Sequence, residues 1–296
     1  MADPASISII IPARNEARGL RMLLPRLVEL FPRAEILVVD DGSTDETSAV
    51  CAEYRVKTLR HPYAKGNGAA IKSGARAAKG GVFVFMDADG QHQAQDIEPL
   101  LSKLAEGYDM VIGARRRASQ AGLHRAVAND LFSRFASWMV GQPIADLTSG
   151  FRVVKASLFK QFLYLLPNGF SYPTTITMAF FRAGYSVAYE PVHVLPRVGG
   201  SSHIHPLRDG VRFLLIILRI GTLFSPQKLF LPISAAFFFL GLGYYLYTYL
   251  TAGRFTNMSA LLIITAVLTF LIGIVSEQIS ALHYKDTKNP DEPALR

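Results

Sequence analysis

The chain has 296 residues, a formal net charge of +8 and a single cysteine, Cys51. One cysteine excludes an internal disulfide and is typical of a reducing compartment. The cations gather near the apolar C-terminal third, and no stripe of basic and aromatic residues occurs. A membrane surface or an anionic substrate therefore explains the charge better than nucleic acid does. The opening "MADPAS" is not apolar, so we expect no signal peptide.

Short apolar runs alternate with helical patterns from Ser6 to about Gly113. The apolar runs are "SISIIIP", "AEILVVDDGS", "VKTLRH", "GVFVFMDADG" and "DMVIGAR". Strands that alternate with helices predict an α/β, Rossmann-like fold with a mostly parallel sheet and right-handed crossovers. Ligands of such sheets bind beyond the carboxyl ends of the strands. We therefore expect the functional site at that edge.

Polar residues follow several predicted strands at the point where each strand ends. They are Asn15 and Glu16 after the first strand, Asp40 and Asp41 after the second, Asp87 and Asp89 after the fourth, and Arg115 after the fifth. Any one of these residues could cap a helix. Their convergence at one edge of the sheet favours a ligand site.

The segment "FMDADGQH" ends an apolar strand with two acids, Asp87 and Asp89. Side chains alternate along an extended chain, so both carboxylates point the same way and repel one another. Carboxylates are hard oxygen ligands, and Mg²⁺ is usually held by one or two of them together with substrate phosphates. The segment therefore predicts a Mg²⁺ or Mn²⁺ site that also binds a phosphate-bearing ligand.

Several common nucleotide and metal motifs are missing from the sequence. There is no P-loop, which disfavours an ATPase, and no G-x-G-x-x-G after a strand, which disfavours a Rossmann dehydrogenase. No His or Cys cluster has zinc spacing.

Two apolar runs, Leu229–Leu250 and Met258–Ile279, are each about 22 residues long. That length is close to the roughly 20 residues that span a bilayer as a helix. The connector "TAGRFTN" is short, so the two runs predict a transmembrane hairpin. Cations flank the hairpin on both outer sides, whereas the connector has only Arg254. The positive-inside rule then predicts an integral membrane protein with its catalytic domain and both termini in the cytoplasm.

The stretch before the hairpin has an amphipathic pattern, with Arg208, Arg212 and Arg219 recurring at helical spacing among apolar residues. Such a pattern is typical of a segment at the membrane interface. We therefore expect four parts, which are a catalytic domain over 1–203, an amphipathic juxtamembrane region over 204–228, a hairpin over 229–280 and a cytoplasmic tail over 281–296.

Six motifs in order resemble one known family. They are "IIIPARNE", "VVDDGSTDET", "MDADGQH", "VIGAR", "DLTSGFRV" and "PRVGGSSH". Over roughly residues 6–205 the chain is similar to family 2 glycosyltransferases of GT-A fold, in the polyprenyl-phosphate branch typified by dolichol-phosphate mannose synthase and bactoprenol glucosyltransferases. The resemblance implies inverting, metal-dependent transfer of a hexose from GDP-mannose or UDP-glucose to dolichyl or undecaprenyl phosphate. The product would be a polyprenyl-phosphate sugar at the cytoplasmic membrane face.

The resemblance also implies roles for individual residues. The donor nucleotide sugar would be bound by Pro12, Ala13, Asn15, Glu16, Asp40, Asp41, Asp87, Ala88, Asp89, Gln91 and Arg197. Within this set the metal ligands would be Asp87, Asp89 and Gln91. The acceptor phosphate would be bound by Arg115, Arg125, Ser202 and His203, the last standing where family members often have lysine. The catalytic residues would be Asp89, Arg115, Arg125 and Arg197, with Lys65 either a further donor-side cation or a solvated loop residue.

A polyprenyl phosphate is already anionic near neutral pH, because the second pKa of a phosphate monoester is near 6. Such an acceptor needs no strong general base, unlike a sugar hydroxyl. Asp146 is the only acid in "DLTSGFRV", and we expect it to have a structural or positioning role.

Three other classes of protein share some of these features. A processive polysaccharide synthase would carry a Q-x-x-R-W motif, but the only tryptophan is Trp138 in "SRFASWMV". A non-catalytic membrane protein that binds sugar nucleotides stays open, although both metal acids are present. A transporter is disfavoured, because two spans provide no path within one chain. Homo-oligomerisation also stays open.

Overall fold

The computed structural model describes residues 7–115, 133–169, 172–193 and 221–285. The chain forms two compact units, Met1–Ile204 and His205–Arg296. The first contains the sheet, and the second contains the two long helices. Most of the predicted amphipathic region lies outside the described residues.

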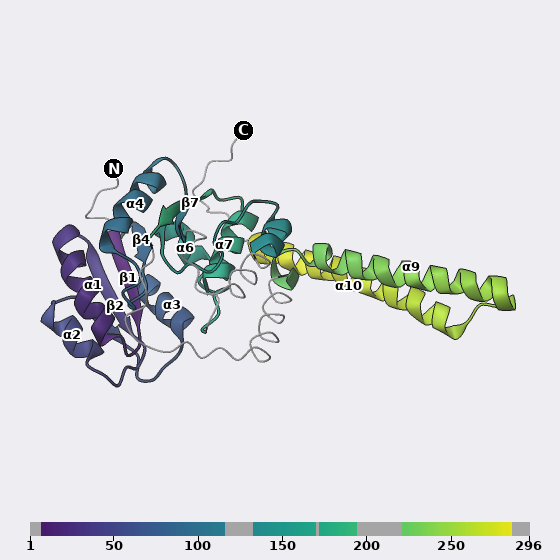
Figure 1. The fold of residues 1–296 in the computed structure, drawn as a ribbon, viewed down its shortest axis with the longest axis horizontal. Coiled ribbons are helices and arrows are strands. Elements are labelled where there is room, and N and C mark those ends of the chain that lie inside the picture. The colour runs from purple at the N-terminus through teal and green to yellow at the C-terminus, as the bar shows by residue number, and fades with distance from the viewer. Residues whose placement is uncertain (1–6, 116–132, 170–171, 194–220, 286–296) are drawn as a thin grey trace. The chain divides into compact units, whose positions relative to one another are not determined.

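The first unit is built on a seven-stranded sheet in the order β3-β2-β1-β4-β6-β5-β7 (Figure 1). The strands are β1 Ile7–Ala13, β2 Glu35–Asp40, β3 Lys57–Arg60, β4 Val82–Phe85, β5 Met110–Arg115, β6 Arg152–Lys155 and β7 Val187–Val192. All adjacent pairs are parallel except the two that involve β6. The prediction of a mostly parallel α/β sheet is confirmed.

The reversed strand β6 is an addition to the predicted pattern. It pairs antiparallel with β4 on one side, where Arg152 lies opposite Phe85, and with β5 on the other, where Arg152 lies opposite Ile112. Its sequence "RVVK" has only two apolar residues and is basic at both ends, so it shows neither an apolar run nor an alternating pattern. Backbone pairing with β4 and β5 therefore makes this segment a strand, although its local sequence does not indicate one.

Helices cover both faces of the sheet. They are α1 Ala17–Leu30, α2 Thr47–Glu53, α3 Asn67–Ala77, α4 Ile97–Ala105, α6 Ala156–Gln161 and α7 Tyr172–Arg182, with a short 3-10 turn, η2, over Ala94–Asp96. Residues 133–140 are also helical. This arrangement explains why the predicted strands are nearly continuously apolar.

The alternation of side chains along β1 shows how the two faces are filled. Ile9 and Ile11 join one buried cluster with Leu20 and Leu24 of α1. Ile10 points to the opposite face, where a Cβ added to Gly74 of α3 would lie 2.4 Å from its Cγ2. Helix α3 therefore rests directly on the sheet, and the three isoleucines are fully buried. The rigid sheet this creates carries the loops at its carboxyl edge.

The second unit is a hairpin of two long helices, α9 Pro226–Ala252 and α10 Asn257–Lys285. Helix α9 ends at Gly253, whose φ of 63° is left-handed and whose N–H donates to the Tyr249 carbonyl at 2.9 Å. Ser234 donates its hydroxyl to the Ala266 carbonyl at 2.8 Å and joins the helices. Both helices are long and apolar enough to cross a membrane.

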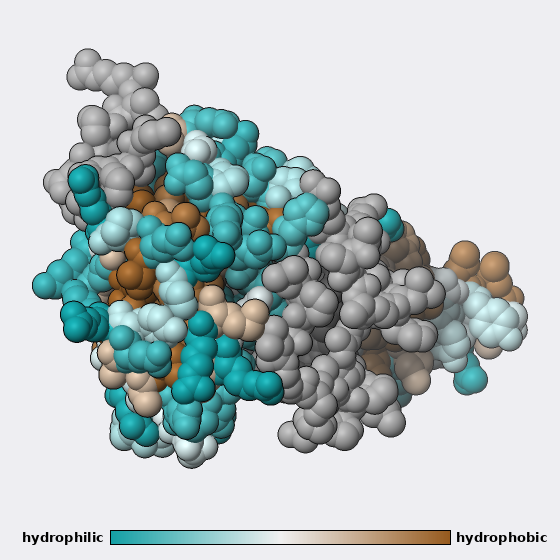
Figure 2. Space-filling view, turned by 60° about the vertical axis from the view of Figure 1, so that its left-hand side comes forward, coloured by the Kyte–Doolittle hydropathy of each residue, from teal (hydrophilic) through white to brown (hydrophobic). Residues whose placement is uncertain are grey.

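The surfaces of the two units differ in polarity (Figure 2). Hydrophilic residues dominate the visible face of the sheet unit, whereas hydrophobic residues lie at the surface of the hairpin. Among the latter, Phe239 is 67% exposed and Leu250 is 75% exposed. A helix that leaves large apolar side chains outside suits a hydrocarbon environment.

Candidate active site

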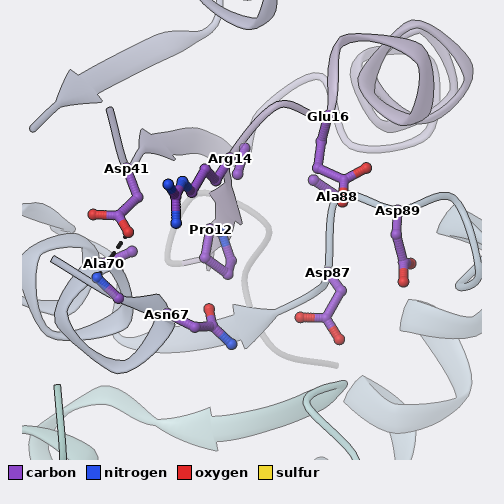
Figure 3. A pocket seen from close by; sticks show the side chains of 11 residues that line it. Pro12, Arg14, Glu16, Asp41, Asn67, Ala70, Asp87, Ala88 and Asp89 are labelled. Carbon is purple, nitrogen blue, oxygen red and sulfur yellow. Dashed lines mark hydrogen bonds between the residues drawn. The ribbon is translucent and has the colours of Figure 1, made fainter. Parts of the chain in front are cut away.

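A cleft of about 350 Å³ opens at the carboxyl ends of β1, β2 and β4 (Figure 3). Seven residues expected at the donor site line it, namely Pro12, Ala13, Glu16, Asp41, Asp87, Ala88 and Asp89. Four further residues complete the lining, namely Arg14, Gly66, Asn67 and Ala70. The segments that follow β1, β2, β3 and β4 thus all contribute to one cleft.

The cleft has two chemically different sides. Figure 3 shows Asp41 and Ala70 on one side of Pro12, and Asp87 and Asp89 on the other. The Asp41 side has one carboxylate near the Arg14 side chain, whereas the opposite side has three acids, because Glu16 lies there with Asp87 and Asp89. An elongated ligand with a ring at one end and phosphates near the other would match this division.

Asp41 is nearly buried, and three groups donate hydrogen bonds to it. Its Oδ1 accepts from His61 Nδ1 at 2.7 Å and from the Lys65 N–H at 2.8 Å, and its Oδ2 accepts from the Gly66 N–H at 2.8 Å. Burial by itself raises the pKa of the Asp41 carboxyl, but the His61, Lys65 and Gly66 bonds outweigh burial and lower this pKa below its ordinary value. Asp41 is therefore an ionised, rigidly held acceptor.

Asp40 does not line the cleft, although it is the neighbour of Asp41. Its fully buried carboxylate accepts from the Ser43 N–H at 2.8 Å and from the Ser48 hydroxyl at 2.5 Å. Consecutive side chains at the end of a strand point to opposite sides. The structure thus places Asp41 at the cleft, whereas Asp40, at the end of β2, binds the loop residues that follow.

Asn15 also lies outside the lining and fastens the first loop to the second. Its φ of 56° is left-handed, a conformation that Asn adopts more readily than most residues. Its Oδ1 accepts from the Thr44 N–H at 2.8 Å, and its own N–H donates to Ser43 Oγ at 2.9 Å. These bonds hold the turn that presents Arg14 and Glu16 to the cleft.

The acidic side depends on close approach between Asp87 and Gly150. A Cβ added to Gly150 would lie only 2.9 Å from Asp87 Oδ2. The Gly150 carbonyl accepts from the Tyr172 hydroxyl at 3.1 Å, which fixes this backbone. The Asp89 Oδ1 accepts from the Gln91 N–H at 3.1 Å. Gln91 itself is not among the residues that line the cleft.

The acidic pair suits a metal that is partly ligated by its substrate. Among the described residues, no group of three or more His, Cys, Asp or Glu could hold a metal alone. Two carboxylates on one side of an open cleft leave further positions for phosphate or water oxygens, as Mg²⁺ and Mn²⁺ require. The two carboxylates therefore fit a divalent ion that binds together with a phosphate ligand.

Arg115, at the end of β5, is held by Asp146. Its Nε lies 2.9 Å from Asp146 Oδ2, and its guanidinium also contacts the Thr148 hydroxyl. Burial by itself lowers the pKa of the Arg115 guanidinium. The hydrogen bond to Asp146 and the negative charges of Asp146 and Asp87 outweigh burial and raise this pKa. Asp146 also accepts from the Thr148 and Ser149 N–H groups at 3.0 and 3.1 Å.

Arg152 is a site-neighbouring residue that sequence reasoning missed. It is fully buried, and among the described residues it has no ion pair with a carboxylate. It donates to the Pro173 carbonyl at 3.2 Å, to Thr177 Oγ1 at 3.2 Å and to the Ser149 carbonyl. Arg152 therefore joins the Asp146–Gly150 segment to the start of α7. The sequence carries no signal for this role, because Arg152 begins a short segment that also ends in a basic residue, Lys155.

Four predicted site residues lie outside the described residues. They are Arg125, Arg197, Ser202 and His203. Lys65 is described, and its Nζ lies 5.7 Å from the centre of the Tyr63 ring. It is not among the residues that line the cleft.

A mostly parallel α/β sheet with one reversed strand, and an acidic pair in a cleft at its carboxyl edge, defines a nucleotide-sugar-dependent glycosyltransferase of GT-A fold. Comparison with known families supports this class, because the description "Glycosyl transferase family 2" matches residues 8–163. The chain belongs to that family. A second description, "GtrB C-terminal hairpin", matches residues 225–282.

Relatives with names extend the similarity beyond the family description. Glycosyltransferase AglJ of Haloferax volcanii is 28% identical over 99% of this chain and 99% of its own length. Polyprenol monophosphomannose synthase of Mycolicibacterium smegmatis is 28% identical over 68% of this chain and 83% of its own length.

The fold also resembles that of a solved enzyme. Glucosyl-3-phosphoglycerate synthase of Mycobacterium tuberculosis, in complex with Mn²⁺, UDP and glucosyl-3-phosphoglycerate, superposes with a TM-score of 0.58 at 19% identity. The match covers 73% of this chain and 78% of that one. This similarity concerns the fold alone.

Proposed function

We propose that this glycosyltransferase moves a hexose from a nucleotide sugar to a polyprenyl phosphate, with inversion, at the cytoplasmic face of a membrane. The observation that carries the proposal is the cleft in which Asp41 lies on one side and the pair Asp87 and Asp89 on the other. A chain with this cleft and two apolar helices long enough to span a bilayer suits a soluble donor and a lipid acceptor.

The donor would lie along the cleft. Its base would contact the Asp41 side, and its diphosphate would reach Asp87 and Asp89. These two residues would hold Mg²⁺ or Mn²⁺, and a bound divalent ion would neutralise the charge that develops on the leaving diphosphate. The mycobacterial enzyme of similar fold was solved with Mn²⁺ and UDP, which supports a metal role for the acidic pair.

The acceptor would meet a cation rather than a general base. Arg115 is charged and held by Asp146, so it offers a fixed partner for a phosphate. Asp146 is a poor base, because bonds from Arg115 and Thr148 overcome the effect of burial and lower its pKa. A phosphate monoester needs no base, since its oxygen is anionic already. The name of the M. smegmatis relative, a polyprenol monophosphomannose synthase, supports this acceptor class.

The hairpin would anchor the catalytic unit where the lipid arrives. Helices α9 and α10 would cross the membrane twice, with Arg254 in the short connector on the far side. The cations flanking both outer ends of the hairpin support a cytoplasmic catalytic unit and cytoplasmic termini.

The test is to incubate membranes that contain the protein with a panel of nucleotide sugars and undecaprenyl or dolichyl phosphate. Transfer should require Mg²⁺ or Mn²⁺ and should stop when a chelator is added. The Asp89→Asn variant should lose about 100-fold or more in rate, as expected when electrostatic stabilisation is removed. Glu106→Gln, which removes a charge from the exposed Lys103 pair, serves as the control. Undiminished transfer with chelator or with Asp89→Asn would refute the metal role.

A further inference from the structure

We infer that the Asp41 side of the cleft is built for a base that offers a single ring N–H, namely uracil, and that His61 excludes guanine. The inference rests on the proposed function, because it assumes that the cleft binds the donor nucleotide. It narrows the donor from two nucleotide classes to one.

The first step is a count of acceptor positions on Asp41. An ionised carboxylate has about four lone-pair sites, two on each oxygen. His61 and the Lys65 N–H occupy both sites on Oδ1, and the Gly66 N–H occupies one site on Oδ2. One acceptor position therefore remains for a ligand, and it belongs to Oδ2.

The second step is that His61 is locked in its donor role. Its side chain is 4% exposed, and its Nε2 lies 2.9 Å from Ser73 Oγ on α3. The His61 backbone N–H donates to the Asp40 carbonyl at 2.8 Å, which fixes the main chain. Because Asp41 is ionised and can only accept, the proton of this contact sits on Nδ1. His61 therefore cannot turn away and release Oδ1.

The Gly66 bond to Asp41 is equally fixed. Gly66 has a φ of 104°, and a Cβ there would lie 2.5 Å from the Asn168 carbonyl oxygen. The segment against it is fastened by Lys72, whose Nζ donates to the Leu166 carbonyl at 3.0 Å and to the Asn168 side chain. A neighbouring backbone thus holds the Gly66 N–H on Oδ2.

The third step compares the bases. Guanine offers N1–H and an amino N–H side by side and pairs best with both oxygens of one carboxylate. In this cleft Oδ1 is full, so one guanine donor would be buried without a partner, which is costly. Uracil offers only N3–H, which the free position on Oδ2 satisfies. Its two flanking carbonyls need donors, and Arg14 and Asn67 on the cleft lining can donate.

Adenine and cytosine fit less well than uracil. Each places a ring nitrogen with a lone pair beside its amino group, and that lone pair would face the Asp41 carboxylate. Repulsion between the two acceptors disfavours both bases. Ala70, a small residue beside Asp41, leaves space for a flat ring.

The experiment measures dissociation constants of UDP, GDP, ADP and CDP for the full-length protein in detergent with Mn²⁺, by calorimetry. We expect UDP to bind at least about tenfold more tightly than GDP, the effect of one unpaired buried donor. Equal or tighter binding of GDP, ADP or CDP would overturn the inference and leave the proposed function intact. Failure of every nucleotide to bind would instead overturn the proposed function.

Two His61 variants test the cause. His61→Phe keeps a flat ring but removes the donor to Oδ1, so the preference for UDP over GDP should shrink about tenfold. His61→Asn restores an N–H at the position of Nδ1 and should keep most of the preference. His193→Phe, at an exposed histidine that is not among the residues lining the cleft, is the matched control. An unchanged preference in a folded His61→Phe protein would contradict the role of His61, and if this variant does not fold, loss of preference in His61→Asn would contradict it.

Discussion

Asp146 Oδ2 accepts a hydrogen bond from Arg115 Nε at 2.9 Å, across 31 positions of sequence. Asp146 is nearly buried, and it also accepts from two backbone N–H groups of its own loop. The pair therefore joins the end of β5 to the segment that lies against Asp87. It fixes the direction of a cation beside the acidic side of the cleft.

The first prediction concerns this pair. Asp146→Asn should leave the chain folded but release Arg115, because the charge that orients the guanidinium is removed. We expect transfer to fall about 10- to 100-fold, since small displacements of a positioning group cost that much. The KM for polyprenyl phosphate should rise while the KM for the nucleotide sugar changes little, and steady-state kinetics with each substrate varied will measure both.

Asp109→Asn is the control for that experiment. Asp109 pairs with Lys155 at 2.7 Å near the start of β5, at the opposite edge of the sheet. The Asp109→Asn change removes a similar ion pair far from the cleft, so the activity of this variant should stay near that of the parent. A matching loss of activity in both variants would show a general effect on stability instead of positioning.

The second prediction concerns pH and Glu35. Burial raises the pKa of Glu35, but bonds from Lys57, the Lys79 N–H and Ser8 outweigh it and lower the pKa from 4.5 to about 2. A lowered pKa contributes stability that is fully present above pH 4.5 and is lost as the pH falls towards 2. Glu35→Gln should therefore be less stable at pH 7 by about 2 kcal/mol, with the gap closing at acid pH.

Thermal unfolding of parent and variant between pH 7 and pH 2 will measure that gap. Glu29→Gln removes a carboxylate from an exposed pair with Arg26 and should change stability by less than about 0.5 kcal/mol. A gap between parent and Glu35→Gln that stays constant down to pH 2 would contradict the assigned linkage.

The third prediction concerns the buried Arg152. Arg152→Lys should destabilise the sheet unit more than Arg152→Met, although lysine keeps the charge. Lysine cannot reach all three acceptors that the guanidinium satisfies, and a buried ammonium is costly. Methionine leaves those acceptors without a donor but removes the buried charge. Melting temperatures of the two variants decide the order, and the reverse order would refute the argument.

The fourth prediction concerns the hairpin. A Cβ on Gly273 would lie 2.8 Å from the Phe230 Cβ, whereas one on Gly243 would meet no heavy atom of the described residues within 4 Å. Gly273→Ala should therefore separate the helices and lower the stability of the detergent-solubilised protein by about 1–3 kcal/mol. Gly243→Ala should be neutral or slightly stabilising, because alanine is the better helix former. Equal effects of the two changes would contradict the close approach at Gly273.

Much of the fold is predictable from local patterns. The five expected strands and the two apolar runs correspond to β1–β5 and to α9 and α10. The strands are recognisable because they alternate with helical patterns, and the two runs are recognisable by their length. The acidic segment "FMDADGQH" is also recognisable from the sequence, since two closely spaced carboxylates at the end of an apolar strand repel one another and indicate a bound cation. Strand β6 was missed, because it has only two apolar residues between two basic ones, and its pairing with β4 and β5 defines it as a strand.

The site was predictable in kind but less so in detail. Asp40 and Asp41 are equivalent as letters, and only the direction of each side chain separates the supporting acid from the one at the cleft. Arg14 and Asn67 gave no signal, because exposed polar residues in loops and at helix starts are common. His61 gave none either, since its meaning depends on its contact with Asp41.

The sequence by itself determined the alternation of strands and helices, the acidic pair and the apolar hairpin. These depend on periodicity and composition, which are properties of neighbours along the chain. Only the tertiary structure decided that β6 runs antiparallel to its neighbours and that Asp146 holds Arg115. It alone also decided that His61 and Gly66 donate hydrogen bonds to the Asp41 carboxylate. Those features depend on closing long loops, and the energy that selects one closure comes from burial and from hydrogen bonds between segments that local sequence does not relate.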